Sequence, residues 1–362
     1  MKTPPVRVVQ AANAARTMLQ AVVRRMVPPE VALLELASGF MATQAVYAAA
    51  RLGVADALAS GPLSADAVAA KIGSPPDTTY RLLRACAGFG IFREGSTGRF
   101  ELTTMGMRLR SGTRESMLPV ILMLGHPSYQ GTWGQLVKVI QTGQPGAEDV
   151  LGQNLWDYLD ADHEFAATFD DAMTRLSALD WPSVDAAYDF TTFSTIVDIG
   201  GGHGQLLSLI LQAATSARGV LLERPALVRK AEDHLREAGV LSRCRIESGS
   251  FFETAPSDGD LYLMRRVIHD FSDEQAAAIL SNVRDHMPSG ATLLLLESVV
   301  PPGNTPHFAK SLDLDMMVFV DGRERTEREF VALLARVGLP VSRVVPTIST
   351  LSLIEAVAGR KP

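Results

Sequence analysis

The chain has 362 residues and a formal net charge of −6; 47% of its residues are apolar and 20% are charged. One hydrophobic core rarely grows beyond about 300 residues, so the length predicts two domains. The negative charge gives no general attraction to nucleic acid or anionic lipid, and we expect neither as a partner. Cys86 and Cys244 lie far apart, which argues against a disulfide framework or a zinc site and indicates the reducing cytoplasm.

Neither a membrane span nor a targeting signal is expected. The longest apolar runs, such as residues 117–124 and 292–296, fall well short of the roughly 20 residues that a spanning helix needs. The basic N-terminal stretch lacks the apolar core of a signal peptide. We therefore expect a soluble protein.

Residues 1–115 form the first predicted domain, which is mostly helical. Residues 35–59 are rich in Ala and Leu, with apolar residues three or four apart, which predicts one or two buried helices. Two shorter helices follow, the first starting at Ser64 and the second at Asp77, and each ends at a glycine. Residues 91–103 then alternate around a Gly-Ser-Thr-Gly turn, as in a hairpin. This order is typical of a winged helix.

The rest of the chain is predicted to contain a helical linker and an α/β domain. Residues 116–190 carry helical patterns and form the linker, which we expect to line a substrate site. In residues 191–362, short apolar strands alternate with helical stretches, which predicts a mostly parallel sheet with helices on both faces. Ligands of such sheets bind at the carboxyl ends of the strands.

A buried strand that includes Asp198 runs into a glycine-rich turn, VDIGGGHG, before a helix that begins near Gln205. Glycines there allow positive φ angles and a close approach of a ligand to the backbone. The spacing does not fit the G-x-G-x-x-G/A pattern of dinucleotide-binding folds. The next strand ends in Glu223, an acid placed to accept hydrogen bonds from both hydroxyls of a ribose. Turn and acid together indicate a nucleoside site.

Four segments in order, VDIGGGHG, LLERP, GSFFE and LYLMRRVIHDFSDE, resemble the class I S-adenosylmethionine-dependent O-methyltransferases of the plant caffeate and bacterial polyketide-tailoring type. The resemblance covers nearly the whole chain. It implies a Rossmann-like methyltransferase sheet, an N-terminal winged-helix domain that forms a homodimer, and S-adenosylmethionine as the methyl donor, with S-adenosylhomocysteine as product.

The resemblance also implies the residues that bind the cofactor. Gly200 and Gly202 would line the methionine part, Glu223 the ribose and Phe251 the adenine. Arg265 stands in place of a family lysine, and Ser250 in place of the usual Asp. The full implied set is Asp198, Gly200, Gly202, Glu223, Gly249, Ser250, Phe251 and Arg265. Two further positions depart from the family: Arg266 stands where plant members have an aromatic residue, and Phe271 replaces a common Trp.

His269 follows the strand LYLMRRVI and is the candidate general base. A histidine accepts a proton near neutral pH, and a phenol of pKa about 10 is a poor nucleophile until it loses its proton. The resemblance places Glu297 and Glu324 beside His269, where a carboxylate would fix the imidazole tautomer. Because no metal-ligand spacing is evident, we expect a metal-independent reaction.

We expect the substrate to be a small hydroxylated aromatic molecule. Flexible thioethers and aromatic rings suit such a surface. The candidate substrate residues are Trp133, Phe169, Met173, Asp270, Met316 and Met317.

Two alternatives stay open at this point. The winged-helix pattern also occurs in ligand-sensing transcription regulators, although Arg81 and Arg84 are the only cations of the second short helix and phosphate binding needs more. Some members of the family have replaced methyl transfer by decarboxylation or hydroxylation, and the His269, Glu297 and Glu324 set favours ordinary methylation.

Overall fold

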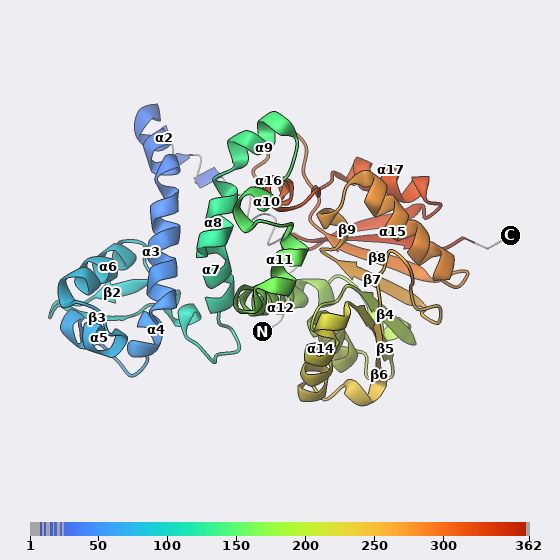
Figure 1. Ribbon diagram of the computed structural model, residues 1–362, viewed down its shortest axis with the longest axis horizontal. Coiled ribbons are helices and arrows are strands. Elements are labelled where there is room, and N and C mark those ends of the chain that lie inside the picture. Colours follow the sequence, from blue (N-terminus) through green and yellow to red (C-terminus); the bar gives the residue numbers. More distant parts are fainter. Residues whose placement is uncertain are drawn as a thin grey trace. The chain divides into compact units, whose positions relative to one another are not determined.

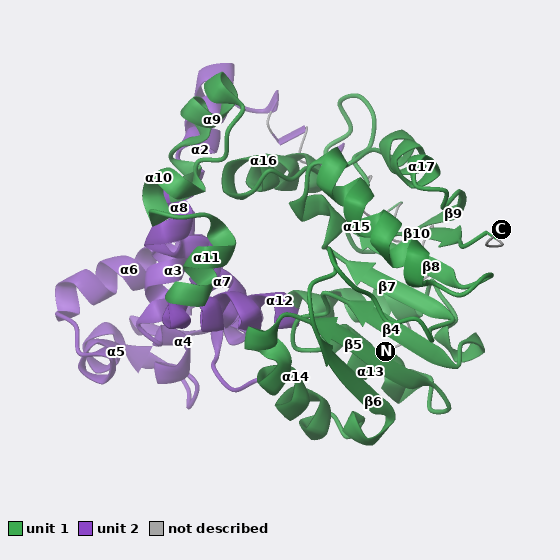
Figure 2. Ribbon diagram, turned by 45° about the vertical axis from the view of Figure 1, so that its right-hand side comes forward, with its two compact units in different colours: residues 1–17, 132–161, 176–362 green, residues 18–131, 162–175 purple. Residues whose placement is uncertain are grey.

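The computed structural model describes residues 25–359 without a gap and, before them, residues 8, 11, 15, 16, 18, 19, 22 and 23. Most of the basic N-terminal stretch therefore lies outside the described residues. The chain divides into two compact units (Figure 2). Unit 1 consists of residues 1–17, 132–161 and 176–362, and unit 2 of residues 18–131 and 162–175. These units differ from the predicted segments 1–115, 116–190 and 191–362, because residues 116–190 contribute to both.

Unit 2 is helical apart from one small sheet (Figure 1). Its helices are α2 (Pro29–Ala37), α3 (Gly39–Arg51), α4 (Val54–Ala57), α5 (Ala65–Ile72), α6 (Pro76–Gly88), the 3-10 helix η1 (Gly106–Leu109), α7 (Leu118–Gly125), most of α8 (Pro127–Trp133) and the first part of α12 (His163–Asp185). Its strands are β1 (Leu63–Ser64), β2 (Phe92–Glu94) and β3 (Arg99–Leu102), in the order β1-β3-β2.

The winged-helix elements form as predicted. The Ser64 hydroxyl accepts a hydrogen bond from the Ala67 N–H and caps α5, which ends at Gly73 in the left-handed conformation. Helix α6 begins one residue before Asp77, at Pro76, and ends at Gly88. Strands β2 and β3 pair antiparallel around the predicted turn. Their shared core includes Val68, Leu83, Phe92 and Phe100.

The prediction of buried helices in residues 35–59 is wrong for α2 and for the start of α3. No residue of α2 is buried, and in α3 only Ala49 and Ala50 are. The exposed large apolar side chains of α2 and the start of α3 are Val31, Leu33, Leu34, Leu36, Phe40 and Met41. The two helices follow one another over 23 residues, Pro29–Arg51, long and apolar enough to cross a membrane by length and composition alone. We had expected no such stretch. A periodic apolar pattern indicates that one face of a helix is apolar. It does not indicate whether the same chain or another molecule covers that face.

Unit 1 contains a seven-stranded sheet in the order β6-β5-β4-β7-β8-β10-β9. The strands are β4 (Thr195–Ile199), β5 (Arg218–Glu223), β6 (Cys244–Ser248), β7 (Leu261–Arg265), β8 (Thr292–Glu297), β9 (Val341–Pro346) and β10 (Ser352–Val357). The first five run parallel, and β10 is antiparallel to both β8 and β9. The mostly parallel α/β fold predicted from the sequence is confirmed, with an antiparallel edge that was not predicted.

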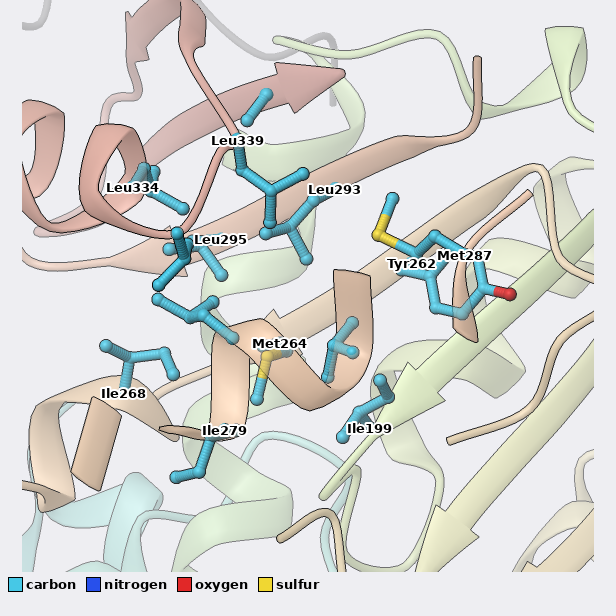
Figure 3. Close-up of a cluster of buried hydrophobic side chains, with 14 of the residues drawn as sticks. Ile199, Tyr262, Met264, Ile268, Ile279, Met287, Leu293, Leu295, Leu334 and Leu339 are labelled. Atoms are coloured by element: carbon cyan, nitrogen blue, oxygen red, sulfur yellow. The ribbon is translucent and has the colours of Figure 1, made fainter. Parts of the chain in front are cut away.

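Helices cover both faces of this sheet. The helices of unit 1 are α9 (Leu136–Thr142), α10 (Ala147–Leu151), α11 (Leu155–Ala161), the end of α12, η2 (Phe190–Thr192), α13 (Gln205–Ala213), α14 (Pro225–Glu237), η3 (Leu241–Arg243), η4 (Ile268–Asp270), α15 (Asp273–His286), α16 (Ala309–Phe319) and α17 (Glu327–Arg336). Figure 3 shows part of one face, where Ile279 of α15 and Leu334 of α17 pack with Met264 of β7 and Leu295 of β8. On the other face, α13 and α14 pack on the alternate residues, such as Leu263 and Leu296.

The strand order reverses at β4. From β4 the chain proceeds through β5 and β6 on one side, and β7 and β8 lie on the other. In an open parallel sheet, such a reversal opens a crevice at the carboxyl ends of the two neighbouring strands. The predicted cofactor residues, with His269 and Glu297, lie at or just after the carboxyl ends of β4, β5, β6, β7 and β8.

Candidate active site

The glycine turn after β4 has the backbone conformation that the sequence predicted. Gly200 and Gly202 have φ angles of 68° and 60°, in the left-handed region that residues with side chains rarely adopt. A Cβ atom on Gly200 would lie 3.1 Å from Val267 Cγ2 and 3.4 Å from Phe251 Cε1. The turn therefore brings its bare backbone close to the segments that follow β6 and β7.

Glu223 lies at the end of β5 and holds this turn. It is buried, with 7% of its surface exposed. Its Oε2 accepts a hydrogen bond from the Gly202 N–H (2.8 Å), and its Oε1 accepts one from the Arg224 N–H (2.8 Å). Each carboxylate oxygen can accept a second hydrogen bond, so Glu223 can hold the turn and a ligand hydroxyl together.

Asp198 is fully buried beneath the turn, and neither of its carboxylate oxygens has a hydrogen-bond partner among the described residues. Burial, followed by the nearby charge of Glu223, raises the pKa of Asp198 to about 7, although Arg265 opposes the shift. Buried polar groups are normally paired. An unpaired carboxylate beside a glycine turn fits a ligand that brings positive charge or hydrogen-bond donors.

The segment after β6 contributes Gly249, Ser250 and Phe251. The Gly249 N–H donates to the Glu223 carbonyl oxygen (3.1 Å), which ties this segment to β5. The Ser250 hydroxyl accepts from the Phe252 N–H (3.3 Å), so it stabilises its own loop. The Phe251 ring stands edge-on to Phe271, with centroids 5.8 Å apart. Aromatic rings beside the turn provide a flat apolar surface suited to a nucleobase.

Two arginines follow each other at the end of β7 and share one acid. Arg265 Nη2 lies 2.7 Å from Asp180 Oδ2, and Arg266 Nη2 lies 3.7 Å from the same oxygen. Arg266 also donates to the Thr350 hydroxyl (3.3 Å). Asp180 lies in the second half of α12. The sequence analysis does not predict its role, because the residues around it form no recognisable motif.

His269 is buried, and both its ring nitrogens face carboxylates. Its Nδ1 lies 2.7 Å from Glu324 Oε1, at hydrogen-bond distance, and its Nε2 lies 3.4 Å from Asp270 Oδ1. Burial raises the pKa of Glu324 to about 8, and Arg266 is the largest influence that opposes the shift. Burial likewise raises the pKa of Asp270 to about 7, against the charge of His269.

Glu297 has a different hydrogen-bond role from the one expected. Its Oε1 accepts from the backbone N–H groups of Val267 (3.1 Å) and Ile268 (2.9 Å), so it shapes the turn that carries His269. No hydrogen bond joins Glu297 to the imidazole within residues 25–359. His269, Glu297 and Glu324 nevertheless lie close together: one ring nitrogen of His269 and one carboxylate oxygen of each glutamate lie within 4.8 Å of one another. The fold thus gathers three groups that the sequence spacing keeps far apart.

Arg325 is a further residue that the sequence did not single out. It is fully buried and donates to the carbonyl oxygens of Ile268 (3.0 Å) and Phe271 (2.9 Å). Its Nε donates to Asp273 (2.9 Å). Arg325 therefore holds carbonyl oxygens of the loop around His269, while Glu297 holds its N–H groups. Its only sequence signal was a charged stretch, which more often indicates a solvated surface.

The comparisons with known proteins agree with this geometry. Residues 133–340 match the O-methyltransferase domain, and residues 34–111 match the O-methyltransferase dimerisation domain. The chain belongs to this O-methyltransferase family. It is an S-adenosylmethionine-dependent methyltransferase of the type that acts in secondary metabolism, and it carries a dimerisation domain. The resemblance stated from the sequence is confirmed, and membership leaves no support for a transcription regulator.

Relatives of this methyltransferase act on different atoms. It is 39% identical to phenazine O-methyltransferase PhzM of Lysobacter antibioticus, over 91% of this chain and 96% of that one. It is 36% identical to 8-amino-8-demethylriboflavin N,N-dimethyltransferase of Streptomyces davaonensis, over 86% and 90%. A crystal structure of the O-methyltransferase NcsB1 from neocarzinostatin biosynthesis, with S-adenosylmethionine and 2-hydroxy-5-methyl naphthoic acid, matches with a TM-score of 0.75 at 31% identity, over 88% and 96%.

The predicted substrate residues of the methyltransferase fall in both units. In unit 1, the Trp133 indole N–H donates to Asp315 (2.7 Å), which ties α8 to α16, where Met316 is buried and Met317 half-buried. In unit 2, Phe169 and Met173 are half-buried on α12. Their contact with a substrate stays a prediction.

Proposed function

We propose that this methyltransferase transfers a methyl group to a hydroxyl of a small aromatic molecule, with His269 as the general base. The observation that carries the proposal is the buried pair of His269 and Glu324, 2.7 Å apart, at the carboxyl edge of the sheet beside the glycine turn. Nε2 of His269 would take the proton from the hydroxyl, while Glu324 would stabilise the imidazolium through Nδ1. A ring nitrogen without hydrogen needs no such base, so the pair favours oxygen as the acceptor.

The residues around the turn fit S-adenosylmethionine, which supplies a methyl group on a positively charged sulfur. Glu223 would accept the ribose hydroxyls with its remaining lone pairs, and Phe251 would pack on the adenine. Asp198, lacking a partner, would pair with the positive charge that the cofactor brings, directly or through water. Gly200, Gly202 and Gly249 would leave room for it, with Ser250 and Arg265 at its edge. S-adenosylhomocysteine would be the product.

We propose that the substrate lies between His269 and apolar side chains, among them Trp133, Met316 and Met317, with Asp270 near the reacting hydroxyl. Phe169 and Met173, which the sequence also suggested, belong to unit 2 and are not part of this arrangement. Thioether side chains adapt to flat aromatic surfaces. The relatives with phenazine and naphthoic acid substrates support this class.

The reaction is further proposed to need no metal. Some atoms of His269, Glu297 and Glu324 that could bind a metal already form hydrogen bonds. Their partners are another of these three side chains or backbone N–H groups. A histidine base makes a Lewis acid unnecessary. Adding a chelator should leave the rate unchanged. Loss of activity that magnesium restores would contradict this part of the proposal.

We also propose a cytoplasmic homodimer. The exposed apolar side chains of α2 and α3 would be covered by a second copy, since large exposed apolar patches mark contact surfaces. Most of these side chains, from Leu34 onward, lie in the region that matches a dimerisation domain, which supports a second copy over a membrane. No nucleic acid is expected.

The decisive experiment incubates the enzyme with S-adenosylmethionine and a panel of phenols, each paired with the corresponding aromatic amine. Mass spectrometry should show that each phenol gains the mass of one methyl group. NMR of the product should show that this methyl group is bonded to oxygen. Methylation of the amines alone would overturn the choice of oxygen. A product that lost carbon dioxide or gained a hydroxyl would indicate diverged chemistry.

A further inference from the structure

Two segments that are far apart in the chain lie against each other around His269. One is the loop of residues 268–273, which contains His269, and the other is the segment of residues 322–325. The Arg323 N–H donates to the His269 carbonyl oxygen (2.8 Å). A Cβ atom on Gly322 would collide with this same oxygen. The close approach of the two backbones therefore requires glycine at position 322.

The side chain of Arg325 joins the same two segments. It is fully buried, and its guanidinium donates to the carbonyl oxygens of Ile268 (3.0 Å) and Phe271 (2.9 Å), which lie on either side of His269 in the chain. Its Nε also donates to Asp273 Oδ1 (2.9 Å), at the start of α15. A guanidinium presents its N–H donors in a rigid planar fork, so it fixes the relative positions of the acceptors that it binds.

Glu324 is fixed within the second segment by backbone contacts. Its N–H donates to Asp313 Oδ1 (2.9 Å) of α16, and the Val300 N–H donates to the carbonyl oxygen of Arg325 (3.0 Å). The two segments thus carry the partners of the buried pair, with Glu324 Oε1 2.7 Å from His269 Nδ1. Moving one segment against the other would change this contact, and a misplacement of about 1 Å at an active site can lower a rate about 100-fold.

The charge of Arg325 is an expensive way to fill this space. Burying a guanidinium costs free energy that its ion pair with Asp273 (2.8 Å) and its hydrogen bonds offset, and an apolar side chain of similar volume often stabilises a fold as well or better. What an apolar side chain lacks is directed donors. The position therefore suits a side chain that orients the loop.

We propose that Arg325 is a positioning residue, which holds residues 268–271 against the segment of Glu324 so that the imidazole of His269 keeps its contact with Glu324 and its direction toward the substrate. The inference rests on the proposed role of His269 as the base. Arg325 does not contact the reacting atoms in this proposal. It acts through the backbone of the loop.

The test compares Arg325→Lys with the matched control Arg243→Lys. Arg243 also donates to backbone carbonyl oxygens, those of Leu211 and Ala217 (both 2.7 Å), but it precedes β6, at the opposite edge of the sheet from His269. Lysine keeps the charge and loses the planar fork. With the phenol of the panel that is methylated fastest, Arg325→Lys should lower kcat about 10- to 100-fold, and Arg243→Lys should keep the parent kcat.

A double-mutant cycle separates positioning from general damage to the fold. His269→Ala removes the group that Arg325 is proposed to position. Adding Arg325→Lys to His269→Ala should therefore lower the residual rate by only about twofold or less. A fall by the same factor in both backgrounds would overturn the proposal, because Arg325 would then act only on the stability of the fold.

A second readout does not depend on catalysis. NMR of protein with isotope-labelled histidine follows Nδ1 of His269, whose resonance is identified by its absence in His269→Ala. Glu324→Ala gives the position of this resonance when the contact with Glu324 is lost. In Arg325→Lys the resonance should move toward that position, and in Arg243→Lys it should stay at the parent position.

Asp273→Asn weakens the hold on Arg325 from its exposed end and should fold even if Arg325→Lys does not. It should move the Nδ1 resonance in the same direction by a smaller amount. A resonance that stays at the parent position in every folded variant of Arg325 and Asp273 would overturn the role of Arg325. If His269→Ala methylates at the parent rate, the proposed base is wrong, and the Nδ1 resonance still tests whether Arg325 positions the imidazole.

Discussion

In unit 1, several buried carboxylate oxygens have no hydrogen-bond partner among the described residues, whereas in unit 2 leucine and phenylalanine side chains stand exposed to water. Within residues 25–359, both carboxylate oxygens of Asp198 and the Oε2 atoms of Glu297 and Glu324 have no hydrogen-bond partner, while Leu36 of α2 and Phe40 of α3 are 76% and 58% exposed. Each arrangement is costly for a chain alone, the first through lost solvation of polar groups and the second through exposed apolar area. Buried polar atoms without hydrogen bonds indicate that unit 1 binds a charged small ligand. Exposed apolar side chains indicate that unit 2 binds an apolar protein surface.

The largest effect should come from His269→Ala. Because the methyl donor already carries its leaving group, the protein must supply proximity and proton removal. The kcat should fall by roughly 10²- to 10⁴-fold, the usual contribution of a positioned base, with cofactor affinity nearly unchanged. The defect should shrink as the pH approaches the pKa of the phenol.

Steady-state kinetics and calorimetry on the same preparation check this. A folded His269→Ala protein that binds the cofactor and methylates at the parent rate at neutral pH would show that the histidine is structural. The oligomeric state should stay that of the parent, since the change lies in unit 1 alone.

The second effect concerns Glu223, whose two oxygens each hold a backbone N–H. Glu223→Ala should weaken S-adenosylmethionine binding by about 10- to 100-fold, since charge-assisted hydrogen bonds contribute about 1.5–3 kcal/mol. Glu223→Gln, which keeps one acceptor, should lose less. Calorimetric titration measures both. Unchanged affinity in the Ala variant would remove Glu223 from the cofactor site.

Unit 2 is tested by the double variant Leu36→Glu, Phe40→Glu. Burying two charges in an apolar contact should weaken self-association by tenfold or more, while the cofactor affinity of unit 1 stays unchanged. Val331→Glu is the matched control, since Val331 is an exposed apolar residue of unit 1. Light scattering over a range of concentrations measures the effect. A parent protein that is already monomeric at micromolar concentration would refute the dimer.

Local patterns predicted those parts of the fold that neighbouring residues determine. The glycine turn, the cap at Ser64 and the strands that contain Asp198, end at Glu223 and precede His269 form where the sequence placed them. The misses involve partners far apart in the chain. Asp180 binds Arg265 across 85 positions, and Arg325 reaches Ile268 across 57. Such pairings are set by topology, which a single sequence does not display.

The same limit explains two errors of assignment. Strand β10 inserts between β8 and β9, an arrangement that its own residues do not encode locally. Glu297 and Glu324 were both expected to orient the imidazole, and only Glu324 has the hydrogen bond, because Glu297 lies within reach of two backbone N–H groups. Residue type narrows the chemistry of a position, and geometry decides which partner it takes.

The smallest expected effect is a dependence of stability on pH that arises at Asp198. Its pKa is raised from 3.8 to about 7 in the folded protein, first by burial and then by Glu223. Between these values the folded state holds a proton that the unfolded chain has lost, so this group makes the free energy of unfolding fall as the pH rises. Histidines with a lowered pKa, such as His234, act in the opposite direction below about pH 6.5, so the parent curve alone is uninformative.

The difference between the parent and Asp198→Asn isolates the group. Asparagine has nearly the same shape and never ionises, so the variant should gain stability relative to the parent by roughly 1 kcal/mol per pH unit between pH 5 and 7, and level off above. Urea unfolding at several pH values measures this. A saturating concentration of S-adenosylmethionine should reverse the ranking, because the ionised parent then gains a partner that the variant cannot match. A pH-independent difference would mean that Asp198 is ionised throughout, and the contrast between the two units would then rest on Glu297 and Glu324 alone.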